Sequence, residues 1–322
     1  MKTPLFLTAA FLALRLAAYA APEPGQPVFV IVQGAEGEES YGKAFAKQTS
    51  LWQQAAKSAG ARAIVIGQDA EAAEPDRARL EKTLAAEPRE GAAPLWLILI
   101  GHGTFDKQEA RFNLRGDDVS ASELAAWLVP VKRPLALLNT ASASAPFLKA
   151  VSAPGRIVIT ATRSGNEQNY ARFGGYLAPA LGDKASDLDQ DGQISLLEAF
   201  LSASAKTAEF YKNDGRLATE HALIDDNGDG LGTPAAWFKG LRATKKPADA
   251  AAVDGLRAQQ WMLLASATEA ARPEAWRAQR DALEEKIAAL REKKESVPAD
   301  DYYRQLEPLL IELARLYQKD PS

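Results

Sequence analysis

The chain of 322 residues contains no cysteine and only two histidines. It can therefore form no disulfide bond, no thiolate metal site and no thiol nucleophile. Its 38 basic residues are outnumbered by 42 acidic ones, which argues against a nucleic-acid-binding protein because such proteins usually present a basic face. The length and the 47% hydrophobic content suit one sizeable globular domain with an appendage, or two domains.

The N-terminal segment has the three parts of a secretory signal peptide. Lys2 precedes an apolar stretch at residues 5–18, and Ala-Tyr-Ala at residues 18–20 has the small-residue pattern of a cleavage site. A membrane anchor is the alternative, but the stretch is shorter than the roughly 20 residues that span a bilayer, and Arg15 interrupts it. We expect residues 1–20 to be removed, leaving a secreted or periplasmic protein with no stable membrane span.

Apolar segments that end in glycine or in small polar residues recur along the first half of the chain. They alternate with segments of helical periodicity, which indicates a parallel sheet covered by helices on both faces. The apolar segments are residues 28–34, 61–67, 95–101, 134–140 and 155–162. The sequence thus predicts an α/β fold of the α/β/α sandwich type.

The composition changes after residue 243. Residues 244–255 have the polar, alanine-rich composition of a linker. Within residues 256–322, apolar side chains recur at helical spacing in residues 274–295 and 301–319, with a break at Ser-Val-Pro between them. We expect an antiparallel helical hairpin with a coiled-coil-type seam, serving either as a structural cap or as a docking or dimerisation arm.

Polar side chains follow two of the predicted strands. In open parallel sheets ligands bind beyond the carboxyl ends of the strands, and His102 stands there between Gly101 and Gly103. The strand at 134–140 runs into a block of small and hydroxylated residues that includes Ser142. These residues could place a base beside a nucleophile, or they could simply bond the backbone and cap the next helix.

The order of these blocks resembles the caspase–hemoglobinase class of cysteine peptidases, with the legumain-like branch nearest. "GHG" at residues 101–103 matches the strand-end His-Gly block of that family, and "ASASA" at residues 141–145 stands where the family has Ala-Cys. The likeness covers residues 28–240. It implies a caspase-like domain over residues 21–243, with His102 as the catalytic histidine and Ser142 in place of the nucleophilic cysteine. It also implies an oxyanion hole formed by the backbone of Gly103 and Ser142.

The loss of the thiol gives two hypotheses for function. The first is a peptidase homologue without peptidase activity, which acts as a binding or scaffolding module for a peptide or protein partner and can form oligomers through its hairpin. The second is a hydrolase with Ser142 as nucleophile and His102 as base, because a hydroxyl needs an efficient base to be activated. A close contact between the two side chains would favour the enzyme.

The segment "DLDQDGQISLLE" at residues 187–198 matches all twelve positions of an EF-hand loop. Carboxylates at positions 1, 3 and 5, a backbone carbonyl at position 7 and a bidentate glutamate at position 12 form an oxygen ligand set that suits calcium. The expected ligands are Asp187, Asp189, Asp191, Gln193 through its carbonyl, Ser195 and Glu198. Exported proteins usually bind calcium weakly through such loops, so we expect a structural ion.

A second segment, "DDNGDG" at residues 225–230, repeats the first half of this pattern. Asp225, Asn227 and Asp229 fit positions 1, 3 and 5, but position 12 is Ala236, so the bidentate ligand is missing. The segment is therefore either a second ion site or a turn held by side-chain hydrogen bonds. The nearby His221 is the only imidazole in this region, which argues against a transition-metal site.

Overall fold

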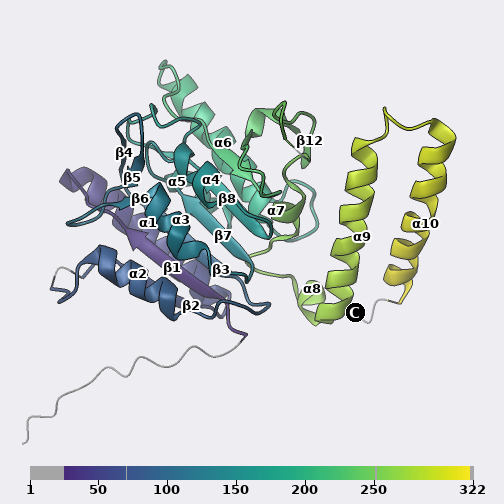
Figure 1. Cartoon of the computed structure of the whole chain (residues 1–322), viewed down its shortest axis with the longest axis horizontal. Coiled ribbons are helices and arrows are strands. Elements are labelled where there is room, and N and C mark those ends of the chain that lie inside the picture. The colour runs from purple at the N-terminus through teal and green to yellow at the C-terminus, as the bar shows by residue number, and fades with distance from the viewer. Residues whose placement is uncertain (1–24, 70, 251, 320–322) are drawn as a thin grey trace, which may run out of the picture.

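The computed structural model describes residues 25–69, 71–250 and 252–319 (Figure 1). A seven-stranded sheet with the order β10-β9-β8-β7-β3-β1-β2 lies at its centre. The strands are β1 (Val28–Gln33), β2 (Arg62–Ile66), β3 (Leu95–Ile100), β7 (Leu135–Asn139), β8 (Arg156–Thr160), β9 (Leu223–Asp225) and β10 (Thr233–Pro234). The first five pair in parallel, and β9 and β10 extend the sheet antiparallel. The predicted α/β class with a mainly parallel sheet is confirmed, whereas the expected signal peptide lies outside the described residues.

Helices cover both faces of this sheet. Side chains alternate between the faces of a strand, so Phe29 and Ile31 of β1 belong to one buried cluster and Val28 and Val30 to the other. Burial on both faces explains why these strands are apolar throughout. One face is covered by α1 (Glu39–Ser58), α5 (Phe173–Ala180) and α6 (Leu196–Asn213), and the other by α2 (Asp76–Ala86), α3 (Ala121–Leu128) and α4 (Ala145–Val151).

Five short strands form two small sheets beside the main sheet. The strands β4 (Gly103–Phe105), β5 (Ala110–Phe112) and β6 (Val119–Ser120) form a small antiparallel sheet immediately after β3, and β11 (Phe238–Lys239) pairs with β12 (Arg242–Ala243). None of these strands exceeds three residues, which is too short for a periodic pattern in the sequence. The small sheet matters for the site because its first residue, Gly103, directly follows His102.

The C-terminal region ends in two paired helices, α9 (Glu274–Glu292) and α10 (Ala299–Gln318), which confirms the predicted hairpin (Figure 1). Trp276 and Leu283 of α9 pack with Leu316 of α10 in the seam. Two short helices that the sequence did not predict, α7 (Leu256–Gln260) and α8 (Ala267–Ala271), precede the hairpin. Within the described residues, no helix has both the length and the apolar character needed to cross a membrane.

Candidate functional site

His102 lies at the carboxyl end of β3, as the sequence predicts, and its ring is enclosed by aromatic side chains. The ring meets Tyr41 edge-on at a centroid distance of 4.9 Å and Phe45 at 5.1 Å, and Tyr170 lies 6.1 Å away. Its Nε2 is 3.3 Å from the backbone carbonyl oxygen of Glu36. Burial lowers the pKa of His102, because desolvation disfavours the imidazolium more than this carbonyl favours it.

Ser142 is buried, with 2% of its surface exposed, and its hydroxyl is used in two backbone hydrogen bonds. Its Oγ accepts from the amide of Gly103 at 3.1 Å and donates to the carbonyl oxygen of Gly103 at 3.1 Å. In the described chain no hydrogen bond joins Ser142 to His102. The geometry thus brings Ser142 next to the strand end that carries His102, but it pairs the hydroxyl with the backbone.

The contact between Ser142 and Gly103 also explains the glycine. A Cβ at position 103 would come within 2.3 Å of the carbonyl oxygen of Ser142, so no other residue fits there without a shift of the backbone. The amide that the family resemblance would assign to an oxyanion hole is the same amide that bonds Ser142 Oγ. An incoming oxyanion would have to compete with this hydrogen bond.

The chain after Ser142 is held by the loop that follows β8. Ala143 adopts a positive φ of 51°, and its amide donates to the carbonyl oxygen of Glu167 at 2.8 Å. The carboxylate of Glu167 in turn contacts Nδ1 of His221 at 2.6 Å. The second histidine of the chain, His221, therefore pairs with a carboxylate.

The first acidic loop, residues 187–198, folds around the carboxylate of its first residue. Asp187 accepts from the amides of Asp191 and Gly192 at 3.1 and 3.0 Å, so the chain curls around its carboxylate. Carboxylate oxygens of Asp187, Asp189 and Asp191 all lie within 4.8 Å of one another. Three hard oxygen donors at this spacing suit a calcium ion. Burial raises the pKa of Asp189, and the negative charges of Asp191 and Glu198 raise it further.

Glu198, at position 12 of this loop, connects its two ends. One oxygen accepts from the amide of Leu188 at 2.8 Å and, more weakly, from that of Asp189 at 3.4 Å, which are positions 2 and 3. The other oxygen accepts from the amide and hydroxyl of Ser195, position 9, at 2.7 and 2.8 Å. Glu198 is 2% exposed, and together with Ser195 it forms the capping box that begins α6. The structure thus gathers the carboxylates of Asp187, Asp189 and Asp191, whereas the oxygens of Glu198 bond the loop backbone and Ser195.

The second acidic loop, residues 225–236, repeats part of these contacts. Asp225 accepts from the amides of Gly228 and Gly230, both at 2.8 Å. Asn227 Oδ1 accepts from the amide of Asp229 at 2.9 Å, as Asp189 accepts from Asp191 in the first loop. The side chains at positions 3 and 5 therefore form the same hydrogen-bonded turns in both loops, and position 1 accepts from position 6 in both.

A carboxylate from outside the second loop takes the place of its missing position 12. One oxygen of Asp254 accepts from the amides of Asp226 and Asn227, positions 2 and 3, at 3.0 and 3.4 Å. The other oxygen accepts from the hydroxyl of Thr233, position 9, at 2.6 Å. These are the same loop positions that Glu198 bonds in the first loop. Asp254 is 2% exposed, and burial, with the nearby charge of Asp226, raises its pKa to about 8.

Sequence analysis missed Asp254 because it lies 18 positions beyond Ala236, within the segment assigned as a linker. Periodic spacing finds only ligands that are close in the chain, whereas the fold brings this carboxylate back to the loop. An aspartate in an otherwise small and apolar stretch, "AAAVDGL", is the one signal that the sequence offers.

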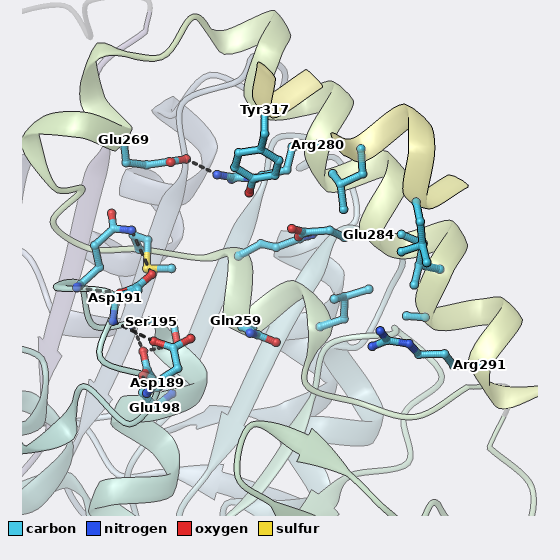
Figure 2. A pocket seen from close by; sticks show the side chains of 18 residues that line it. Asp189, Asp191, Ser195, Glu198, Gln259, Glu269, Arg280, Glu284, Arg291 and Tyr317 are labelled. Atoms are coloured by element: carbon cyan, nitrogen blue, oxygen red, sulfur yellow. Dashed lines mark hydrogen bonds and ion pairs between the residues drawn. The ribbon is translucent and has the colours of Figure 1, made fainter. Parts of the chain in front are cut away.

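A cavity of about 440 Å³ separates the first loop from the hairpin (Figure 2). Asp189, Asp191 and Glu198 line it on the side of the loop, and Glu284 and Arg291 project into it from α9. The first loop is thus open to solvent on one side. A cation bound there would face the hairpin.

No protein-family model and no curated protein matches the chain. Among solved structures, it is similar to the Drosophila initiator caspase Dronc, with 12% identity and a TM-score of 0.44 over 72% of this chain and 93% of that chain. It is also similar to caspase-1 from Spodoptera frugiperda, with 10% identity and a TM-score of 0.39 over 69% of this chain and 94% of that chain. These likenesses concern the fold alone, and the legumain-like branch stays a prediction.

Proposed function

We propose that this protein is an exported, caspase-like module without peptidase activity, braced by calcium, that binds a peptide or protein partner. One observation carries the first part of the proposal. The chain has no cysteine, and the hydroxyl of Ser142, which stands in the nucleophile block, bonds both backbone groups of Gly103. A serine nucleophile needs a base within hydrogen-bond distance of its hydroxyl. The hydroxyl of Ser142 instead bonds the backbone of Gly103.

The alternative proposal is a hydrolase with Ser142 as nucleophile and His102 as base. A fluorophosphonate probe separates the two, because it labels an activated serine and leaves a hydrogen-bonded structural serine unmodified. We expect no labelling of the purified protein, with or without calcium. Labelling that is lost in both Ser142→Ala and His102→Ala would establish the hydrolase.

Calcium is proposed for the first acidic loop because its donor set and its turns fit the ion. The ligands are the three carboxylates of Asp187, Asp189 and Asp191, the carbonyl of Gln193, and Glu198, with Ser195 at the position that often binds through water. The role proposed for the ion is structural. The last three residues of the loop form the first turn of α6, which packs on the central sheet, so a bound cation would stabilise the start of a core helix.

A second ion is proposed for the second acidic loop, with Asp254 as the missing carboxylate. The support is the repeated pattern, in which Asp254 bonds the same three loop positions as Glu198. Asp225, Asp226 and Asp254 are all at most 4% exposed. A divalent cation would offset the cost of burying so many carboxylates together.

The partner surface is proposed on the exposed apolar side chains of α10. Tyr303, Leu310 and Ile311 of this helix expose 58%, 44% and 43% of their surface. Large apolar side chains gathered on one face commonly mark an interaction site. The molar mass measured by light scattering tests this surface, because a Tyr303→Lys and Leu310→Lys double variant should turn any oligomer into a monomer.

A further inference from the structure

The segment that joins the α/β domain to the hairpin, residues 252–266, is held by the first acidic loop, and we call this segment the connector. Ser195 of the loop forms a backbone β-bridge with Met262 of the connector. The side chain of Gln193 accepts from the amide of Ser266 at 2.8 Å. Position 7 and position 9 of the loop are therefore both tied to the connector.

The second acidic loop holds the other end of the connector. Asp226 accepts from the amides of Gly255 and Ala258, both at 2.8 Å, and so caps the start of α7. Asp254, which completes the second loop, is itself a connector residue. The two loops therefore contact the same stretch of chain, which Ala258 and Leu263 also anchor in the buried core.

The connector in turn holds the hairpin. Gln260 Nε2 donates to Glu284 Oε2 at 2.9 Å, and Arg257 lies 3.5 Å from Glu285, so α7 is bonded to the middle of α9. The amide of Val253 donates to Glu292 near the end of α9 at 3.3 Å. Between α9 and the first loop itself lies the cavity of about 440 Å³ rather than packed side chains. The connector therefore contributes several of the contacts that position the hairpin.

We propose that calcium in the two loops fixes the connector and thereby the hairpin against the α/β domain, and that calcium loss releases the hairpin as a unit. This inference rests on the calcium binding proposed above. Without a cation, the clustered carboxylates of each loop repel one another, and the turns that bond the connector lose order. The helices α9 and α10 keep their own seam, so they move together.

The absence of native cysteine makes a direct distance measurement possible, because two introduced cysteines are the only sites that a thiol-reactive spin label can modify. The labels are introduced by Lys57→Cys at the end of α1 and Glu295→Cys in the turn after α9. Both native side chains are exposed, and neither forms a hydrogen bond or ion pair within the described residues. Electron–electron distance distributions of the doubly labelled protein are recorded with calcium and with EGTA. We expect one narrow distance with calcium, and loss of that peak to a broad distribution with EGTA.

Two variants and one control test whether the loops control the position of the hairpin. In the labelled protein, Glu198→Gln and Asp254→Asn should give the broad distribution even with calcium, whereas Glu209→Gln, an exposed change on the same helix as Glu198, should behave as the parent. Glutamine still supports a capping box, so the Glu198 variant should fold. An unchanged distance with and without calcium, together with calorimetric calcium binding, would overturn this inference and leave the calcium proposal intact. Absence of calcium binding would overturn both.

Discussion

Calcium should raise the thermal unfolding midpoint of the purified protein if the acidic loops bind the ion only in the folded state. Loops of this kind in exported proteins bind with dissociation constants of about 0.1–1 mM. At about 10 mM calcium and the tighter limit, the ion is in 100-fold excess over the dissociation constant, which stabilises the fold by about 2.7 kcal/mol per site. For a domain of this size each kcal/mol corresponds to about 2–4 °C, so one site predicts a rise of about 5–10 °C.

The assay is differential scanning calorimetry of the protein in EGTA and in calcium, with magnesium at the same concentration as the ionic control. Glu198→Gln removes one negative charge and one accepting oxygen from the first loop while keeping a residue that supports the capping box. It should lose most of the calcium-dependent rise of that site, whereas Glu209→Gln on the same helix should keep it. An identical midpoint in EGTA and in calcium for the parent protein would refute the reasoning.

Three further predictions concern the strand ends and the second loop. Ser142→Cys creates the only thiol of the chain, at a position that is 2% exposed. This thiol should react with a thiol reagent much more slowly in the folded protein than in denaturant. Equal reaction rates would contradict the burial of the position. His102 should titrate below the ordinary value of about 6.5 in an NMR pH series, and an equal or higher value would show that its ring is not desolvated. Since the folded state disfavours the imidazolium, stability should fall as the pH falls from about 6.5 toward the lower folded pKa, and calorimetry of His102→Gln should show a smaller loss. Asp254→Asn should remove one of two calcium ions in equilibrium dialysis, and an unchanged count would exclude this carboxylate as a ligand.

The parallel strands and the hairpin could be predicted because each is a long segment with a regular apolar pattern. The segment at residues 95–101 is apolar at every position because both faces of β3 are covered, and the seam residues Trp276 and Leu283 recur at helical spacing because one face of α9 is buried. The strands β9 and β10, of three and two residues, were missed because so few residues carry no period.

Only some residues of the candidate sites could be predicted from the sequence, for a different reason. The first acidic loop could be proposed as a calcium site because all its expected ligands lie within twelve consecutive residues. Asp254 was missed because it joins the second loop through the fold, and the hydrogen bonds of Ser142 to Gly103 connect residues 39 positions apart. Spacing along a chain predicts local ligand sets, but contacts between distant segments depend on the register of strands and loops that the sequence pattern does not fix.

The measurement that tests the account most directly is the number of calcium ions bound per chain at saturation, determined by equilibrium dialysis of the parent protein and of Glu198→Gln and Asp254→Asn. The account predicts two ions for the parent and one for each variant, because each carboxylate closes a different loop. No bound calcium in the parent protein, at a concentration of several millimolar, would contradict it.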